Sequence, residues 1–342
     1  MQSQQSHRKD EHVFLAEKAF DQESHAGFDQ VRFIHTALPE MAVSEVTLTP
    51  ELFDWQWPFY INAMTGGSKQ TGERNAQLGR IAAATGLAIA TGSQSVALAD
   101  HSLAETFQVM RHNNPDGFIL GNLGAGKTWA DAKDAIAMID ANALEIHLNV
   151  AQELVMPEGD RDFHWLDDLA EIVAKSPVPI LVKEVGFGMS QETLAQLKQI
   201  GVQYVDIAGR GGTNFATIEN YRREARDMSY LKNWGQTTTE SLLEASTSDM
   251  TVLATGGVRN PLDILTALRL GARAVGISGM VLHSLIQAGE PQTLELMRAF
   301  QTRLAQLMTL VGARDLASLR QVPVVYDQAL VNYAKQRHLE LQ

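Results

Sequence analysis

The chain has 342 residues, of which 45% are hydrophobic and 20% charged, and this composition excludes disordered and fibrous proteins. Lys and Arg total 28 against 40 for Asp and Glu, and the net charge of −12 argues against nucleic-acid or anionic-membrane partners. The absence of cysteine excludes disulfides and thiolate chemistry. With no apolar run of membrane-spanning length and a polar N-terminus, we expect a cytoplasmic protein.

Eight short apolar runs follow a lead-in without a strong repeat, and each run ends in glycine or a polar cluster. They lie at 57–64, 87–91, 117–120, 143–148, 180–183, 202–207, 251–254 and 274–277. Helix-like stretches separate them, as at 72–84, 129–140, 165–174 and 191–200. Apolar runs without alternation are typical of parallel strands buried on both faces. The pattern predicts the α/β class and one (β/α)8 TIM barrel.

No linker rich in Gly, Ser or Pro divides the chain, so we expect one domain in three parts. Residues 1–56 form an N-terminal extension covering the barrel mouth, 57–290 the barrel, and 291–342 a C-terminal helical extension of the same domain. The long gap after the sixth strand, 213–249, predicts a functional loop with a short extra helix.

The segments after strands seven and eight point to a phosphate site. Gly256, Gly257 and Arg259 follow strand seven, while Ser278 and Gly279 follow strand eight just before a helix. These two loops of a TIM barrel commonly bind phosphate through main-chain N–H groups and a helix N-terminus. A phosphorylated ligand is therefore predicted, with flavin mononucleotide (FMN) as the leading cofactor, although glycine turns have a purely structural use as well.

Polar side chains also follow strands four and five. Lys183 is suited to pairing with an anionic cofactor ring, to forming a Schiff base, or to pairing with Glu184, and the residues alone leave these three open. Alternation after strand four points several of His147, Asn149, Gln152 and Glu153 at one cavity. The Glu153 carboxylate suits Mg²⁺, which takes carboxylate oxygens together with substrate phosphates.

A competing motif, GNLGAGKT at 121–128, matches the Walker A pattern of nucleotide triphosphatases, with Asp206 as a possible Walker B carboxylate. It belongs to the third of eight similar units and leaves the turns after strands seven and eight unexplained. In the barrel interpretation Asn122 faces the ligand, while Lys127 and Thr128 open the third helix.

The motifs together resemble a known family. INAMTGGS (61–68), ATGSQS (90–95), GNLGA (121–125), LNVAQE (148–153), VKEVGFG (182–188), DIAGRGGTN (206–214) and ATGGVR (254–259) occur in order after RKDEH (8–12). This set resembles type 2, flavin-dependent isopentenyl-diphosphate delta-isomerase across nearly the whole barrel. The resemblance implies interconversion of isopentenyl and dimethylallyl diphosphate with reduced FMN, NADPH as reductant and Mg²⁺. It also implies a homo-oligomer, a tetramer or octamer.

The resemblance assigns roles residue by residue. Arg8, Lys9 and Gln152 would bind the diphosphate substrate, Glu153 would bind Mg²⁺, and His147, Gln152 and Lys183 would act at the reacting groups. The residues expected to contact FMN are Ala63, Met64, Thr65, Ser93, Asn122, Lys183, Thr213, Gly257, Val258, Arg259, Ser278 and Gly279. Ser95 departs from the basic residue expected there, which puts a diphosphate contact at that position in doubt.

The chemistry is consistent with these residues, because moving an alkene double bond needs a proton donor and then loss of a proton from a neighbouring carbon. We hypothesise that reduced flavin is the acid and base, with Lys183 stabilising its anionic form and Gln152 orienting the alkene or assisting the proton transfer. An FMN-dependent hydroxy-acid oxidase is the second enzyme class, but 254–259 lacks the histidine it would need. A catalytically silent phosphate-binding barrel is the non-enzyme alternative.

Overall fold

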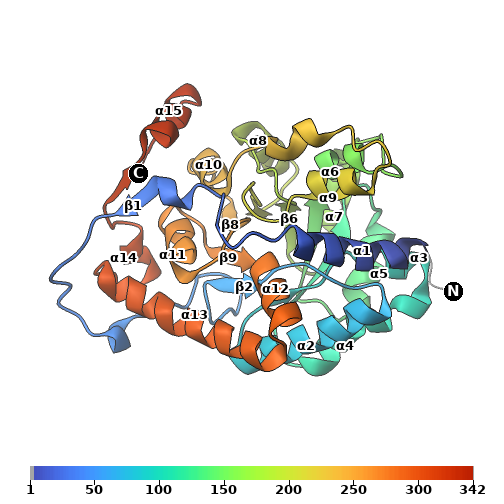
Figure 1. The fold of residues 1–342 in the computed structure, drawn as a ribbon, viewed down its shortest axis with the longest axis horizontal. Helices are drawn as coiled ribbons and strands as arrows, with labels where there is room; N and C mark the ends of the chain where they lie inside the picture. Colours follow the sequence, from blue (N-terminus) through green and yellow to red (C-terminus); the bar gives the residue numbers. More distant parts are fainter. Residues whose placement is uncertain (1–3, 342) are drawn as a thin grey trace.

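A closed barrel of eight parallel strands forms the centre of the computed structural model, which describes residues 4–341 (Figure 1). Every strand pairs with its neighbours in the sequence, and the first also pairs with the last. The strands are β2 (Phe59–Ile61), β3 (Ile89–Ala90), β4 (Ile119–Gly124), β5 (Ala143–Leu148), β6 (Ile180–Glu184), β7 (Tyr204–Asp206), β8 (Thr251–Thr255) and β9 (Ala274–Ile277). The predicted TIM barrel is confirmed, with a strand in each of the eight predicted runs.

The outer helices begin where the sequence supplies capping side chains. Ser68 and Thr128 each form a capping box, and Asn260 caps a helix that has Pro261 in its first turn. The helices around the barrel are α2 (Lys69–Thr85), α4 (Glu105–Asn113), α5 (Trp129–Met138), α7 (Leu166–Lys175), α8 (Gln191–Gln199), α10 (Thr238–Glu244), α11 (Pro261–Arg269) and α12 (Gly279–Gln287). Their buried faces complete the core against the strands.

Two expectations about local structure are corrected. The segment 213–249 contains three short helices rather than one: α9 (Phe215–Arg222), the 3-10 helix η4 (Ser229–Asn233) and α10. The capping side chains Asn214 and Thr237 start α9 and α10, and these signals were available in the sequence. The lead-in also contributes a strand, β1 (Val31–Phe33), which pairs antiparallel with β10 (Val324–Tyr326) near the C-terminus.

The Walker-like segment is not a phosphate-binding loop. Gly121 to Gly124 lie within β4 and pair with β5, and the Ala125 amide donates to the His147 carbonyl. Thr128 is the N-cap of α5, as the barrel interpretation predicts. Asp206 is fully buried beneath the strand ends and bonded to other side chains. These positions argue against the triphosphatase.

The helices at both ends of the chain pack on the outer helices of the barrel, and both α1 (Gln4–Lys18) and α13 (Glu290–Leu310) contact α2 and α12. Helix α1 also contacts α9 (Figure 1). Its side chains line the cavity at the barrel mouth. The long helix α13 also packs on α11 and is followed by α14 (Leu316–Leu319) and α15 (Gln328–Gln336). The division at residues 56 and 290 stays a prediction. Among residues 4–341, no helix is long and apolar enough to cross a membrane.

One buried carboxylate joins three strands inside the barrel. Asp206 ends β7 and accepts hydrogen bonds from Tyr60 Oη (3.1 Å), Asn62 Nδ2 (2.9 Å) and Thr255 Oγ1 (2.5 Å). It also accepts from the Ala208 amide at 3.1 Å. Burial raises the pKa of the Tyr60 phenol, and the Asp206 charge raises it further. The strands β2, β7 and β8 are thus held together by a carboxylate whose charge is compensated by four donors.

Replacing Asp206 by Leu should therefore destabilise the barrel. The change leaves buried donors on Tyr60, Asn62 and Thr255 without this acceptor, and we expect a loss of about 3 kcal/mol or more in the free energy of unfolding. Urea denaturation monitored by circular dichroism measures the effect. Asp249→Ala is the control, because this exposed residue makes only a surface ion pair with Lys198 and should leave the midpoint nearly unchanged. Equal midpoints for the two variants would contradict the structural role of Asp206.

Candidate active site

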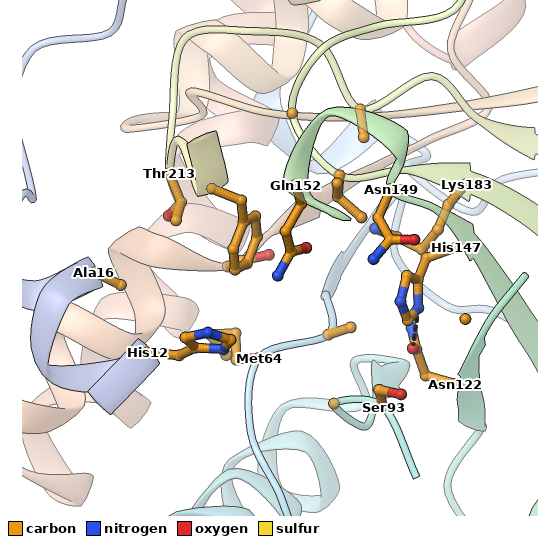
Figure 2. A pocket seen from close by; sticks show the side chains of 18 of the residues that line it. His12, Ala16, Met64, Ser93, Asn122, His147, Asn149, Gln152, Lys183 and Thr213 are labelled. Atoms are coloured by element: carbon orange, nitrogen blue, oxygen red, sulfur yellow. Dashed lines mark hydrogen bonds between the residues drawn. The ribbon is translucent and has the colours of Figure 1, made fainter. Parts of the chain in front are cut away.

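A cavity of about 480 Å³ lies at the carboxyl ends of the barrel strands, under α1. All the site residues predicted from the sequence line this one cavity, from Arg8 and Lys9 in α1 to Ser278 and Gly279 after β9. Figure 2 shows His147, Asn149 and Gln152 pointing into it from the end of β5 and the following helix α6 (Val150–Val155), with His12 of α1 on the other side. The structure brings the predicted residues together, while their individual roles remain predictions.

The corner formed after β8 and β9 fits a phosphate group. The nine-residue helix α12 starts at Gly279, and its N-cap Ser278 makes no side-chain capping bond, so the first N–H groups have no partner from that side chain. The main chains of two loops meet here, since a Cβ on Gly212 would lie 2.7 Å from the Gly257 nitrogen. Gly257 itself has φ +71°. Main-chain N–H groups at a helix N-terminus suit the phosphate of FMN.

Arg259 lies at the same corner, but part of its guanidinium is already used. Its Nε donates to the Asp21 carbonyl at 2.7 Å, and the group stacks over the Phe20 ring at 4.8 Å. Burial lowers the pKa of Arg259, although Asp263 and Asp21 oppose that effect. Arg259 Nη1 also donates to the Val258 carbonyl at 3.3 Å, so the arginine tethers the segment after α1 to the phosphate corner.

The wall formed by β4, β5 and β6 carries Asn122, His147 and Lys183. Lys183 is buried and donates to the main-chain carbonyl of Glu184 at 3.0 Å. The Glu184 carboxylate instead accepts from the amides of residues 185–187, so the two side chains form no direct hydrogen bond. Burial, together with the charges of Lys183 and Lys9, lowers the pKa of His147 to about 3. The imidazole is thus neutral and Lys183 is the cation of this wall.

Helix α1 brings two more cations to the cavity. Arg8 Nη1 lies 3.6 Å from a Glu158 oxygen, while its Nε is buried without a hydrogen-bond partner among the described residues. Lys9 Nζ contacts the Ser93 carbonyl at 3.4 Å. Burial lowers the pKa of Lys9 to about 8, with Arg8 adding to the effect. Half-buried cations, one of them with a buried unpartnered Nε, suit an anionic ligand, because such a ligand would offset their partial desolvation.

Gln152 and Glu153 point in different directions from the start of α6. Gln152 Nε2 donates to Glu219 Oε1 at 3.2 Å, and His12 Nε2 lies 2.8 Å from the same oxygen. Glu153 accepts from Asn149 Nδ2 at 2.7 Å and from the Asp160 amide at 2.8 Å. Within residues 4–341 no group of three or more acidic or histidine side chains could hold a metal. A single carboxylate fits Mg²⁺ only if a ligand's phosphate oxygens complete its coordination.

Three residues that line the cavity or contact its lining were not singled out in the sequence analysis: His12, Glu219 and Glu145. Glu219 lies in α9, where nothing in the local pattern distinguishes it from a surface residue, yet it is fully buried. Burial raises its pKa, but His12 and Arg222 outweigh burial and lower it overall. Glu145 had a detectable signal, because it interrupts the apolar strand ALEIHL two residues before His147 and so shares its face.

Comparison with known proteins places the barrel in a class. The FMN-dependent dehydrogenase model matches residues 122–325, so the chain contains an FMN-binding domain of that family. The flavin-binding domain of baker's yeast flavocytochrome b2 superposes with a TM-score of 0.67 at 18% identity, covering 94% of this chain and 87% of that one. Mandelate oxidase with (S)-2-phenylpropionate gives 0.62 at 15%, covering 92% and 90%. At these identities the likeness concerns the fold.

Closer relatives define the family. Isopentenyl-diphosphate delta-isomerase of Lacticaseibacillus paracasei is 60% identical over 99% of this chain and 98% of that protein. The proteins of the same name from Latilactobacillus sakei and Staphylococcus haemolyticus are 54% and 47% identical, each over 99% of this chain and 99% and 98% of their own. The chain belongs to the isopentenyl-diphosphate delta-isomerase family. The resemblance found in the sequence and the expected enzyme class, an isomerase, are confirmed.

Lys9 gives the cavity a testable pH dependence. Its ammonium is charged below its pKa of about 8 and neutral above it, so an anion in the cavity loses this partner as pH rises through 8. We expect Lys9→Gln to weaken inorganic diphosphate binding to the FMN-loaded protein by about tenfold at pH 7 and by less at pH 9.

Isothermal calorimetry at both pH values measures this difference, and comparing the two proteins at equal pH cancels titration of the ligand. Lys69→Gln is the control, since this lysine is exposed at the start of α2. A loss that is the same at pH 7 and pH 9 would show that the Lys9 charge does not titrate in this range.

Proposed function

We propose that this protein interconverts isopentenyl diphosphate and dimethylallyl diphosphate by an allylic proton shift. Reduced FMN is the proposed cofactor, with NADPH as reductant and Mg²⁺ on the diphosphate. The observation that carries the proposal is that one cavity combines a phosphate corner at α12, a buried lysine on β6, two cations on α1 and a carboxylate at Glu153. A flavin-dependent redox enzyme would also need the phosphate corner and the buried lysine. The two cations on α1, in contrast, suit a second, highly charged anion.

The cofactor would occupy the part of the cavity between the phosphate corner and β6. Ser278, Gly279 and Gly257 would hold its phosphate, and Lys183 would face the opposite end of the group. Bound reduced FMN would supply the proton donor and acceptor for the double-bond shift. Lys183 is the buried cation suited to favour an anionic ring, because Coulomb attraction is strong where water is excluded.

The chain's own side chains would position the substrate. Arg8 and Lys9 would bind the diphosphate, with the unused buried Nε of Arg8 directed to an oxyanion. The amide nitrogen of Gln152 donates to Glu219, and this bond would hold the side chain beside the reacting carbons, where it would orient the alkene or assist the proton transfer. His147 would lie near the substrate as a neutral imidazole.

The proposed metal site depends on the substrate. Glu153 is the only one of the predicted residues with a carboxylate, and Mg²⁺ is commonly held by one or two carboxylates together with substrate phosphates. The Asn149 amide orients one oxygen of Glu153, and the Asp160 amide orients the other. We propose that these bonds present the carboxylate to the ion at the diphosphate end of the cavity.

We also propose a cytoplasmic homo-oligomer, a tetramer or octamer, with no nucleic-acid or membrane partner. Large apolar side chains are exposed on α1 and at η4 and its C-cap, with Phe14 at 67%, Tyr230 at 73% and Trp234 at 61% exposure. Exposed aromatic residues of this kind are typical of subunit contacts, which supports an assembly.

The decisive assay supplies isopentenyl diphosphate, Mg²⁺, FMN and NADPH to the protein without oxygen. We expect dimethylallyl diphosphate as the product, and no turnover when either FMN or NADPH is omitted, because the reduced flavin is required. The product is separated by liquid chromatography and identified by mass spectrometry. If the flavin is bound and reduced by its absorption spectrum and no product forms, the proposed function is wrong.

Glu153→Gln tests the metal role. The change keeps the shape and one oxygen of the side chain but removes the charge, so we expect a loss of about 100-fold or more in turnover together with the loss of Mg²⁺ dependence. FMN binding should be retained. Glu158→Gln is the matched control, because Glu158 lines the same cavity but is paired with Arg222 and Arg8. That variant should keep its Mg²⁺ dependence, and a fully active Glu153→Gln enzyme would reject the metal site.

A further inference from the structure

A chain of three side chains runs from the barrel interior to the cavity wall. Glu145 on β5 lies opposite Asn122 on β4 in the strand register, and His147 follows on the same face of β5. Asn122 Nδ2 donates to Glu145 Oε2 at 2.6 Å, and Asn122 Oδ1 lies 2.9 Å from His147 Nδ1 (Figure 2). Glu145 is fully buried and does not line the cavity, so it reaches the ligand only through the other two residues.

The chemistry of the carboxylate fixes the direction of these hydrogen bonds. An ionised carboxylate only accepts, so Asn122 turns its NH₂ group to Glu145 and its oxygen to His147. The Asn122 oxygen also only accepts, and Nδ1 of His147 must then carry a proton. Because the ring is neutral, it has no proton left for Nε2. Reversing the Asn122 amide would place its oxygen against the carboxylate oxygen, which is repulsive.

The surroundings of Glu145 favour this arrangement at moderately alkaline pH. The pKa of Glu145 is raised to about 7, because burial and the charge of Asp206 outweigh the opposing effects of Lys183 and the Asn122 hydrogen bond. Tyr60 also lies close enough to interact with its charge. The ionised form therefore predominates above about pH 7, and the second oxygen, Oε1, has no hydrogen-bond partner among the described residues.

The free nitrogen of His147 has room at the cavity wall. A Cβ on Gly124 would lie 3.2 Å from Nε2, so the glycine in β4 keeps the space beside this atom open. Both Gly124 and His147 line the cavity. The carbonyl of Leu123 also interacts with the ring and favours its protonation, but Asn122 is the side chain bonded to it.

We propose that Glu145 is a positioning residue that acts through Asn122 to hold His147 in the Nδ1–H tautomer, with Nε2 facing the cavity as a hydrogen-bond acceptor. His147 then contributes a lone pair to the site and leaves the positive charge to Lys183, Lys9 and Arg8. A donor group on a bound ligand or the Lys9 ammonium suits this acceptor, since Lys9 is near enough to lower the pKa of His147. The suggestion that a bound ligand donates a hydrogen bond to Nε2 rests on the proposed function, whereas the tautomer of His147 does not.

The tautomer is read directly from the ¹⁵N chemical shifts of His147, because protonated and unprotonated ring nitrogens resonate apart. The FMN-loaded protein, labelled with ¹⁵N-histidine, is examined at pH 8, and a His147→Asn variant identifies its signals among the 10 histidines. We expect the protonated signal at Nδ1 and the unprotonated signal at Nε2. A proton on Nε2 in the wild-type protein overturns the proposal, whether or not the enzyme turns over substrate.

Two variants test the part played by Glu145. Glu145→Gln is isosteric, and Lys183 favours an orientation in which the new amide turns its oxygen to the cation and its NH₂ to Asn122. This reverses Asn122, so the fraction of His147 with its proton on Nδ1 should fall from nearly all to less than about half. Glu145→Met removes the acceptor and should give a mixture of tautomers.

Glu184→Gln is the matched control. Glu184 ends β6, and burial raises its pKa to about 7 as for Glu145, but its carboxylate accepts from the amides of residues 185–187. The Glu184→Gln substitution should leave the His147 signals unchanged. If Glu145→Gln keeps His147 fully in the Nδ1–H form, Glu145 has no positioning role, and this result stands even if Glu145→Met does not fold.

Discussion

Closing eight parallel strands around one axis brings eight carboxyl ends to one rim, and the rest of this molecule depends on that closure. The Asp206 carboxylate secures it from within, because it accepts hydrogen bonds from the ends of β2 and β8 while belonging to β7. A charge in the centre of a barrel is costly unless every oxygen is bonded, and here four donors surround it. Asp206 and its buried donors below the cavity therefore have a structural role, and the side chains at the strand ends above them are free to bind ligands.

The cationic groups in the cavity are opposite in sign to the net charge of the protein. The chain has a net charge of −12, yet the cavity contains Arg8, Lys9 and Lys183, and the α12 N-terminus adds main-chain donors. At short range a few desolvated cations outweigh a distant acidic surface, since water and salt screen the latter. The same desolvation sets the protonation states inside, with His147 neutral and the Lys9 pKa lowered to about 8.

The N-terminal helix α1 links the cationic side chains of the cavity to the rest of the barrel. Its own residues form part of the wall, and Glu219 of α9 contacts both His12 of α1 and Gln152 of α6. Arg222 joins the same group through Glu219, Glu158 and Glu11. Because the contacts are shared, displacement of α1 would alter the positions of Arg8 and Lys9 and the orientation of Gln152 together. The proposed substrate site thus depends on a segment outside the barrel itself.

The sequence by itself determined the barrel, the strand positions and the family. Strand runs, capping residues and glycine-rich strand ends are local signals, and in a parallel barrel they fix which residues meet at the mouth. This is why every predicted site residue lies in one cavity. Partnerships such as Glu219 with His12, Glu145 with Asn122, and β1 with β10 were decided only by the tertiary structure. They join residues far apart in the chain, and no local pattern states how far a buried carboxylate lies from its donors. The protonation of His147 follows from those distances, since burial and neighbouring charges exist only once the chain has folded.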